Sequence, residues 1–376
     1  MTVRYPNPEL SVGADNKQWW NRAENRRHGF HNAHRLFRRA ASFRAPEVVA
    51  LEVSEDDAIA ALPETHALCA APEFSALVVA REGRILLERA APDFASHAPH
   101  SIQSITKLHM HLIAGRLIAA GRLDPERTFG DTLPDIGGGY AQARVQDALD
   151  MNLANGFTED YDDPLSDCYA EEIALGWRLP GPNEAEPTLG AFVRAITGGD
   201  PVNRTGHALY KSANTDALTL LCDALLPGSL LAEIERTSDA AGYEGAFHVS
   251  LSPEHLPAFS GGGCLSARDL ARFGLLLMRE GGDFLRHSMQ RPGPTLPPPK
   301  DWLRYSNHLM TDGRLIGHAG YGGQFLMVDT LHGTACAYLS VLENESGYDD
   351  AYMARIIDRL RAICVSIDGR IRCAST

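Results

Sequence analysis

Apolar residues gather into strand-like runs near both ends of the chain and into helix-like repeats between them. Residues 76–80 and 84–88 are short and apolar, and the Glu82-Gly83 turn between them predicts a β-hairpin. Within residues 108–121 the apolar positions recur at spacings of three and four, which predicts an amphipathic helix with one buried face. The first structural unit is therefore a strand pair followed by a helix.

The order of the remaining elements indicates a fold class. The same patterns predict helices at 56–62, 145–151, 189–196, 210–226, 267–278 and 349–364, and strands at 305–310, 323–329 and 335–342. Ser266 is the expected N-cap of the helix at 267–278, after a tight turn at 261–266. Strands at both ends with helices in the middle favour an α+β fold (an α/β sandwich) with one mainly antiparallel sheet covered by helices.

This order also predicts the domain organisation. Residues 1–119 and 246–376 are expected to form one α/β domain built from both chain ends, and residues 120–245 an inserted helical domain. A cleft between two such parts is a common place for a binding site. We therefore expect the active site in that cleft.

Composition limits the classes of function. A chain of 376 residues with a net charge of −13 can bury a large core, but it lacks the basic surface that nucleic-acid binding needs. The segment 26–39 is basic and carries interleaved apolar residues, yet in so acidic a chain an amphipathic surface helix is favoured over an RNA-binding stretch. No apolar run reaches the length of a membrane span.

The N-terminus and the cysteines bear on location and metal content. Residues 1–8 lack the basic-then-apolar pattern of a signal peptide. The 7 cysteines are scattered without a C-x-x-C pair, and no Cys/His grouping has zinc spacing. We therefore expect a cytoplasmic monomer or homodimer with reduced thiols and with neither metal nor cofactor.

The candidate for chemistry is Ser104-Ile105-Thr106-Lys107, at the start of the predicted helix. Residues three apart lie on one helical face, so the Lys107 ammonium can fold back towards the Ser104 hydroxyl. Serine is a weak nucleophile until a neighbouring base takes its proton, and lysine is such a base only when its pKa is lowered. The free N–H groups of a helix N-terminus also suit a developing oxyanion. A serine beside an exposed, inert lysine is the alternative.

Three motifs, in this order, give a family resemblance. Ser104-x-x-Lys107 follows a hairpin, Tyr210-x-Ser212 opens a helix, and a His-Ala-Gly motif at 318–320 lies near a late strand. This order resembles the serine β-lactamase and penicillin-recognising superfamily in its class C-like branch. It is more similar still to the 6-aminohexanoate-dimer hydrolase (nylon oligomer hydrolase) group. The similar segments are 149–151, 159–164, 210–216, 262–272 and 323–324, together with Trp19-Trp20.

The resemblance implies a β-lactamase-like fold and a role for each matching residue. Ser104 would attack the acyl carbon, Lys107 would accept its proton, and Tyr210 would pass a proton to the leaving group. The backbone N–H groups of Ser104 and Tyr321 would form the oxyanion hole.

Ser212, His318 and Gly320 are expected to contact the substrate. A rival register makes Ser212-x-Asn214 the second motif, with Ser212 as the proton carrier; Tyr210 is preferred because its flanking residues fit, which leaves Asn214 as a helix cap. His318 stands where lactam-recognising relatives carry a lysine that holds a carboxylate, which disfavours β-lactamase and cell-wall peptidase activity. A structural hydrogen-bonding role for His318 is the alternative.

The acidic run at 159–163 gives one indication about the substrate. If this run lines the cleft, it favours a substrate with an ammonium group, with Asp163 as its contact; a solvated loop is the alternative. The Lys211 side chain is expected to point to solvent. His109 and His111 are two residues apart on a helix and cannot share a face, so they are not a metal pair.

These observations predict a serine hydrolase that cleaves small amides or esters through an acyl-enzyme intermediate. Its partner is a small-molecule amide or ester, with no nucleic acid and no membrane. An acyltransferase or a D-amino-acid peptidase would use the same site. A non-catalytic ligand-binding relative would keep the fold without reacting at Ser104.

Overall fold

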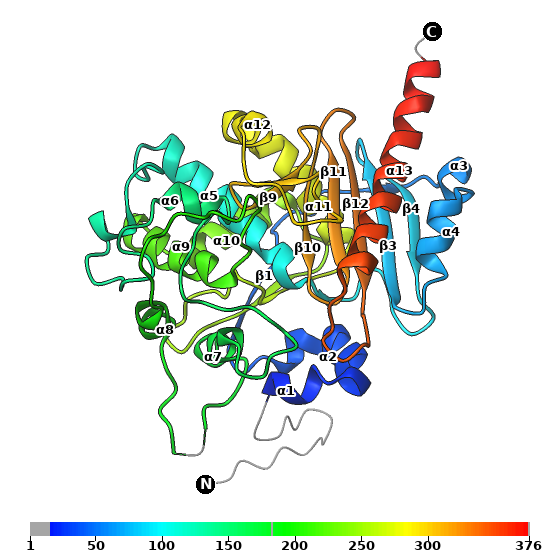
Figure 1. The fold of residues 1–376 in the computed structure, drawn as a ribbon. Coiled ribbons are helices and arrows are strands. Elements are labelled where there is room, and N and C mark those ends of the chain that lie inside the picture. The colour runs from blue at the N-terminus through cyan, green and yellow to red at the C-terminus, as the bar shows by residue number, and fades with distance from the viewer. Residues whose placement is uncertain (1–15, 182, 375–376) are drawn as a thin grey trace.

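The computed structural model describes the backbone of residues 16–181 and 183–374, with side chains from 17 to 367. Its central element is an eight-stranded sheet (Figure 1). In spatial order the strands are β2 (Glu52–Val53), β4 (Arg84–Ala90), β3 (Phe74–Arg81), β12 (Thr334–Ser340), β11 (Gln324–Asp329), β10 (Leu315–Gly320), β9 (Leu309–Thr311) and β8 (Arg304–Ser306). Within the described residues every pairing is antiparallel except that of β2 with β4, which confirms the predicted fold class.

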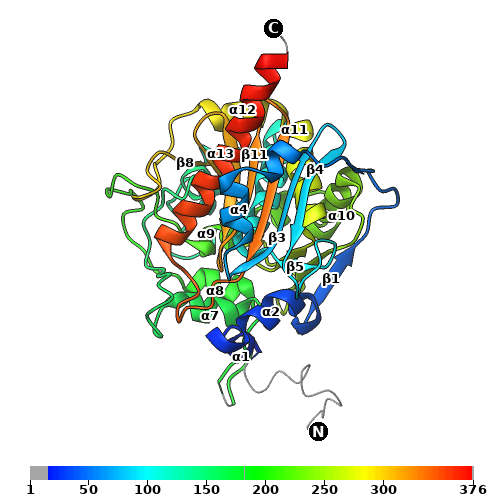
Figure 2. The ribbon, with the colours of Figure 1, turned by 90° about the vertical axis from the view of Figure 1, so that its right-hand side faces the viewer.

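Helices cover both faces of this sheet (Figure 2). Along β3 the side chains alternate between two apolar clusters, with Val78 in one and Val79 in the other. One face packs against α11 (Ala267–Glu280), and the other against α3 (Asp57–Ala60), α4 (Pro63–Cys69) and α13 (Asp350–Ala374). The strand is buried on both sides, which explains why its sequence is an unbroken apolar run.

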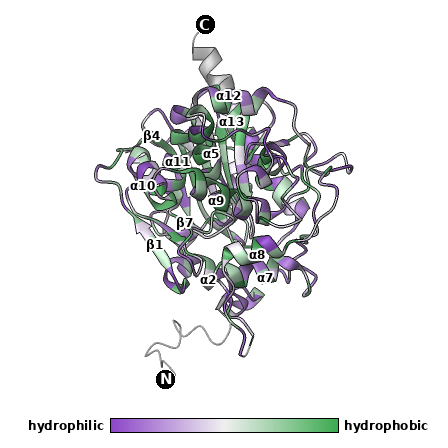
Figure 3. Ribbon diagram, turned by 90° about the vertical axis from the view of Figure 1, so that its left-hand side faces the viewer, coloured by the Kyte–Doolittle hydropathy of each residue, from purple (hydrophilic) through white to green (hydrophobic). Residues whose placement is uncertain are grey.

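The middle of the chain is helical, as predicted. Its helices are α5 (Leu108–Ala119), α6 (Val145–Leu149), α7 (Asp167–Ala174), α8 (Leu189–Ala195), α9 (Ser212–Leu225) and α10 (Leu230–Ala241), with a short turn η2 (Phe129–Asp131). One apolar cluster contains both Val78 of the sheet and Leu218 of α9, so a single core crosses the predicted boundaries. Figure 3 shows much of α5 and α9 in the green of apolar residues. The division at 120 and 245 stays a prediction.

α5 differs from the helix that its periodicity predicts. Residues 108–115 are all buried, not one face of them, because α9, α10 and α12 (Gly282–Gln290) pack around this helix. None of the described helices is by itself long and apolar enough to cross a membrane; the bent pair of α9 and α10, at 98°, meets that length and composition test only together.

A second, four-stranded sheet was not predicted. It consists of β1 (Ala40–Phe43), β6 (Phe247–Ser250), β7 (Gly263–Leu265) and β5 (His100–Ser101). The tight turn expected at 261–266 is wrong over its second half, where β7 pairs with β5 and β6. These strands are too short for periodicity to reveal, and their pairing joins segments far apart in the sequence.

Other boundaries were predicted with mixed success. Ser266 caps α11 as expected, since its hydroxyl accepts a hydrogen bond from the Asp269 N–H. The single strand expected at 305–310 is the hairpin of β8 and β9, because Asn307 and His308 have positive φ angles and turn the chain. Asn214 lies inside α9 and accepts a hydrogen bond from the Tyr140 hydroxyl, so its expected capping role is wrong.

The N-terminal segment packs beside the sheet as α1 (Asn16–Trp20) and α2 (Ala23–Leu36) (Figure 1). The basic segment is therefore an amphipathic helix, as expected, with Phe30 buried. Residues 1–15, on which the signal-peptide argument rests, lie outside the described residues. Arg26 is fully buried and donates hydrogen bonds to the carbonyls of Leu342, Asn344 and Glu345, which ties α2 to the end of the sheet.

Replacing Arg26 tests this anchor. Arg26→Met leaves buried carbonyls without donors while keeping the apolar stem, so the free energy of unfolding should fall by about 2–4 kcal/mol. Urea unfolding measures this. The control is Arg22→Met at the start of the same helix, where the side chain is exposed and the change should be below about 0.5 kcal/mol. Equal effects of the two substitutions would contradict the anchoring role.

Candidate active site

Ser104 lies on a 3-10 turn, η1 (Gln103–Lys107), between β5 and α5. Gln103 enters this turn with φ = 47°, a left-handed conformation that non-glycine residues rarely adopt. Two hydrogen bonds hold it there: the Gln103 amide donates to the Ser101 hydroxyl at 2.7 Å, and the Thr106 hydroxyl donates to the Gln103 carbonyl at 2.6 Å. The sharp change of direction presents Ser104 at the surface of the core, although the adjoining turn residues are buried.

Two strands enclose this turn, and each approaches it through a glycine. A Cβ on Gly263 of β7 would lie 2.6 Å from the Thr106 hydroxyl oxygen. A Cβ on Gly320 of β10 would lie 2.6 Å from the Ile102 carbonyl oxygen. Any larger residue would force the strands away from the turn. The backbone around Ser104 is therefore fixed by both sheets.

Lys107 is fully buried, and its ammonium nitrogen contacts three oxygen atoms. The distance from Lys107 Nζ to Ser104 Oγ is 3.0 Å and to Ser212 Oγ is also 3.0 Å, and the Ser260 carbonyl accepts a further, short bond. Burial lowers the pKa of Lys107, while the negative charge of Glu159 partly opposes this shift. The predicted serine–lysine pair is thus formed in the structure, with the lysine disposed to lose its proton.

Tyr210 is the second predicted catalytic residue, and its hydroxyl interacts with those of Ser104 and Ser212. Its ring lies 5.0 Å from Lys107 Nζ. Burial raises the pKa of Tyr210 well above its usual value, and the charge of Glu159 adds to this shift. The phenol is therefore neutral and can donate a proton.

Ser212 is the first residue of α9, and Glu159 satisfies its polar groups. Its hydroxyl donates to Glu159 Oε1 at 2.8 Å, and its backbone N–H donates to Glu159 Oε2 at 2.5 Å. The Tyr161 hydroxyl donates to the same carboxylate at 2.6 Å. Part of the acidic run therefore reaches the site, where Glu159, and not Asp163, contacts Ser212.

Two cavities meet at Ser104. The outer cleft has a volume of about 510 Å³, enough for a small organic substrate, and its lining includes Tyr210, Tyr321, Leu296, Met310 and Tyr348. The inner pocket, of about 40 Å³, has room for very few water molecules, and its lining includes Lys17, Gln103, Glu171, Trp177 and Ser212. Ser104 and Glu159 line both. A carbonyl carbon bound at Ser104 would therefore be reachable from two sides.

Tyr321 and Gly320, to which the resemblance gives a role, both lie near Ser104. Both line the outer cleft beside Ser104, at the end of β10, and Tyr321 also lines the inner pocket. The Tyr321 hydroxyl accepts a hydrogen bond from Asn21 and donates one to the Ser346 carbonyl, so two bonds hold the end of its side chain. An oxyanion hole formed by the backbone N–H groups of Ser104 and Tyr321 stays a proposal.

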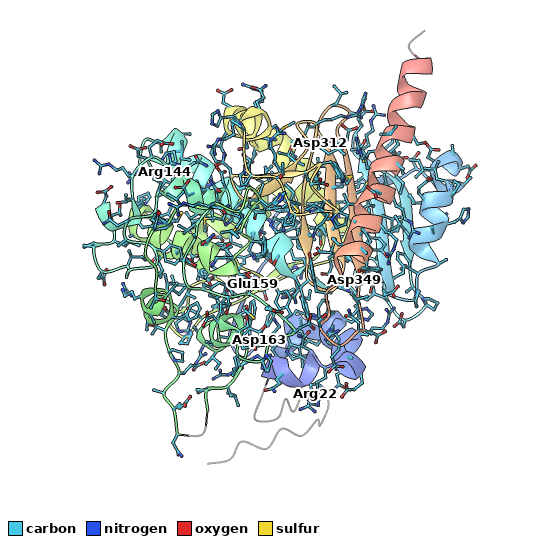
Figure 4. All side chains as sticks on the ribbon, in the orientation of Figure 1. Arg22, Arg144, Glu159, Asp163, Asp312 and Asp349 are labelled. Carbon is cyan, nitrogen blue, oxygen red and sulfur yellow. The ribbon has the colours of Figure 1, made fainter. Side chains whose placement is uncertain are left out.

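Two expected substrate contacts lie elsewhere. His318 is fully buried, with one ring nitrogen bonded to the Tyr305 hydroxyl at 2.8 Å and the other to the Ala319 carbonyl at 2.6 Å. It therefore has the structural hydrogen-bonding role given above as the alternative. Asp163 is exposed, accepts a hydrogen bond from the Leu165 N–H, and is not part of either cavity wall. In the view of Figure 4, Asp163 lies below Glu159, on the side of α1.

Lys211 and the two histidines of α5 have structural roles. Lys211 does not point to solvent, because its ammonium bonds the carbonyls of Asn155 and Phe157. His109 stacks against Phe247. His111 bonds a backbone carbonyl, so the pair does not share a site. Among the described residues, no group of three or more His, Cys, Asp and Glu side chains could hold a metal ion.

Sequence reasoning missed several polar residues of the inner pocket. Lys17 of α1 forms a buried ion pair with Glu172 and lies 4.4 Å from the Trp177 ring. Behind Lys107, Glu171 and Asp216 form a buried acid pair, and burial raises the pKa of Asp216 to about 6. No local motif marks these residues, since they come together only through packing of α1, α7 and α9.

An antiparallel sheet built from both chain ends, with helices on each face and a helical insertion, defines a β-lactamase-like fold. The chain belongs to the beta-lactamase family, whose model matches residues 70–358. With this membership and its hydrolase relatives, the chain is a serine hydrolase.

The relatives agree with this assignment. The 6-aminohexanoate-dimer hydrolase of Paenarthrobacter ureafaciens is 28% identical over 291 residues, which cover 74% of this chain and 71% of the relative. A solved structure named "Putative 6-aminohexanoate-dimer hydrolase from Bacillus anthracis" superimposes with a TM-score of 0.79 at 17% identity, over 99% of each chain. A D-stereospecific amidohydrolase from Streptomyces gives a TM-score of 0.58 at 17% identity, over 80% of this chain and 97% of that one. These two structures show the fold. The predicted resemblance is confirmed.

Gly320 provides a test of the site's backbone. Gly320→Ala places a methyl group against the Ile102 carbonyl, so β10 must withdraw from the turn and displace the Tyr321 N–H. If the Tyr321 N–H is the oxyanion donor, as proposed, we expect kcat/KM to fall roughly 10- to 100-fold, since small displacements of reacting groups have effects of that order. Ester hydrolysis measures this. Gly228→Ala, where a Cβ meets nothing within 4 Å, is the control and should retain activity. An unchanged Gly320→Ala enzyme would rule out this role of β10.

Proposed function

We propose that this serine hydrolase cleaves small amides or esters through an acyl-enzyme intermediate on Ser104. The observation that carries the proposal is the fully buried Lys107, with its nitrogen 3.0 Å from Ser104 Oγ at the junction of two cavities. A lysine that is buried and lowered in pKa can exist as a neutral amine, which a serine nucleophile requires of its base.

In the acylation step, Ser104 Oγ attacks the carbonyl carbon as its proton passes to Lys107 Nζ. The backbone N–H groups of Ser104 and Tyr321 donate hydrogen bonds that stabilise the negative charge on the carbonyl oxygen. The bond to the leaving group then breaks, and the Tyr210 phenol supplies the proton that the leaving nitrogen or oxygen needs. Lys107 returns its proton to Tyr210, so the site is ready for a second step. Water attacks the ester in that step, with the proton transfers running through the same groups.

The outer cleft supports a choice of substrate class. Its apolar lining, with Leu296 and Met310, suits an acyl chain without charge near the reacting carbon. Asp160 and Asp162 lie along the same cleft and favour a substrate with an ammonium group away from the reacting carbon. An amino-terminated amide of this kind agrees with the named activity of the Paenarthrobacter relative.

The nucleophile is tested first. Wild-type protein treated with a fluorophosphonate should gain one adduct by intact-mass spectrometry, and Ser104→Ala should gain none, because the reactive alkoxide would be absent. With p-nitrophenyl acyl esters the wild type should show a burst followed by steady turnover. No adduct in the wild type would favour a binding protein. An adduct that persists in Ser104→Ala would move the nucleophile to another serine.

The proton donor is tested by comparing leaving groups. An amine leaves only when protonated, whereas p-nitrophenolate leaves unaided, so loss of the donor affects amides far more than activated esters. Tyr210→Phe should therefore reduce amide turnover at least about tenfold more than p-nitrophenyl ester turnover.

Ser212→Ala is the matched comparison, because it is expected to reduce both reactions alike. The rival register, in which Ser212 carries the proton, predicts the selective loss in Ser212→Ala instead. The geometry supports Tyr210, because the Ser212 hydroxyl already donates to Glu159.

A further inference from the structure

The hydrogen bonds around Lys107 restrict which way its lone pair can point. The Ser260 carbonyl can only accept, so it takes one N–H of the neutral amine. Two partners of Lys107 remain, the hydroxyls of Ser104 and Ser212, each 3.0 Å away and each able to donate or accept. The Ser104 hydroxyl also lies within donating distance of the Ser260 carbonyl, at a longer 3.3 Å. A neutral amine has one N–H left for these two hydroxyls and one lone pair. Catalysis requires the lone pair to face Ser104.

Glu159 determines which of the two hydroxyls, that of Ser104 or that of Ser212, faces the lone pair of Lys107. A carboxylate only accepts hydrogen bonds, and this one accepts from the Ser212 N–H, the Ser212 hydroxyl and the Tyr161 hydroxyl. Because the Ser212 hydroxyl proton is directed to Glu159 at 2.8 Å, the Ser212 oxygen can only accept from Lys107. The second N–H of Lys107 therefore points to Ser212, and the lone pair points to Ser104.

We propose that Glu159 is a positioning residue: acting through Ser212, it sets the direction of the hydrogen bonds on Lys107 so that the lysine lone pair faces the Ser104 hydroxyl. The inference rests on the proposed function, since it concerns the same site. It assigns a role to the loop 159–163 that is separate from contact with the substrate. It also gives Ser212 a role as a relay between two residues.

Glu159 influences Lys107 by charge as well as by direction. The carboxylates that face Lys107 come from three elements: Glu159 from its loop, Glu171 from α7 and Asp216 from α9. Tyr210, His308 and His318 are the neutral titratable groups nearby. The negative charge of Glu159 favours the ammonium form, so its removal should make Lys107 easier to deprotonate. The two effects of Glu159 therefore have opposite consequences for the activity.

The substitution Glu159→Gln separates the effect of hydrogen-bond direction from the effect of charge. The glutamine amide has one acceptor and one donor, so whichever way it lies, a donor replaces an acceptor at either the Ser212 N–H or the Ser212 hydroxyl. With its oxygen on the N–H, its NH₂ group donates to the hydroxyl, which then turns its proton onto Lys107. We expect kcat/KM for a p-nitrophenyl ester to fall roughly 10- to 100-fold. At the same time the acid limb of the pH profile should shift to lower pH.

The direction in which the acid limb shifts follows because Lys107 acts as a base only when it is neutral. Activity rises as pH passes through the pKa of Lys107, and loss of a neighbouring negative charge lowers that pKa. Asp163→Asn is the matched control, because it removes one charge from the same loop without touching Ser212. It should retain wild-type kcat/KM and a nearly unchanged acid limb. Thermal unfolding of each variant checks that the fold is kept.

The double variant Glu159→Gln/Ser212→Ala tests the relay itself. Without the Ser212 hydroxyl there is no proton to misdirect, so kcat/KM of the double variant should lie within about twofold of Ser212→Ala alone. If the kcat/KM losses of the two single variants multiply in the double variant, the relay through Ser212 is contradicted. A fall in kcat/KM with an unmoved acid limb would reduce Glu159 to a structural support. Wild-type behaviour of Glu159→Gln, with the Ser104 adduct intact, would overturn this inference and leave the hydrolase in place; absence of the wild-type adduct would overturn both.

Discussion

The site depends on a lysine side chain held out of water. Transfer of an ammonium group into a protein interior is strongly unfavourable, so Lys107 needs partners for every N–H and surroundings that tolerate a neutral amine. The oxygens of Ser212 and Ser260 accept from the N–H groups of the neutral amine, and the Ser104 hydroxyl is the third polar group in contact with its nitrogen. The carboxylates nearby oppose the lowering of the Lys107 pKa by burial, which is what the proposed role as a base needs.

The fold meets this requirement by bringing distant segments to one point. Ser104 and Lys107 share a 3-10 turn, whereas Ser212 begins a helix and Ser260 precedes a strand. Two glycine contacts hold the turn between the two sheets. Glu159 then connects the acidic loop to Lys107 through Ser212. Because these groups come from several elements, the reactivity proposed for Ser104 depends on how those elements pack together.

The amino-acid sequence determined the fold class, the order of the elements and the identity of the serine–lysine pair. The apolar pattern predicted the hairpin at 76–88, which precedes the turn that carries Ser104. It also predicted most helices, since long amphipathic segments have patterns that tertiary contacts rarely override. Ser104 and Lys107 were predictable because their spacing of three residues is a local property of helical geometry. The family resemblance, carried by motifs in a fixed order, gave Tyr210 and Tyr321 their proposed roles.

Only the tertiary structure decided which polar residues reach that pair. Glu159 and Asp163 belong to one acidic run and are equivalent in composition, yet the packing of the loop on α9 places the first against Ser212 and leaves the second in solvent. His318 follows the family motif but is turned into the core by its bond to Tyr305. Lys17 lines the inner pocket, although no sequence motif marks it. Such contacts depend on long-range packing, and no local pattern of residues encodes them.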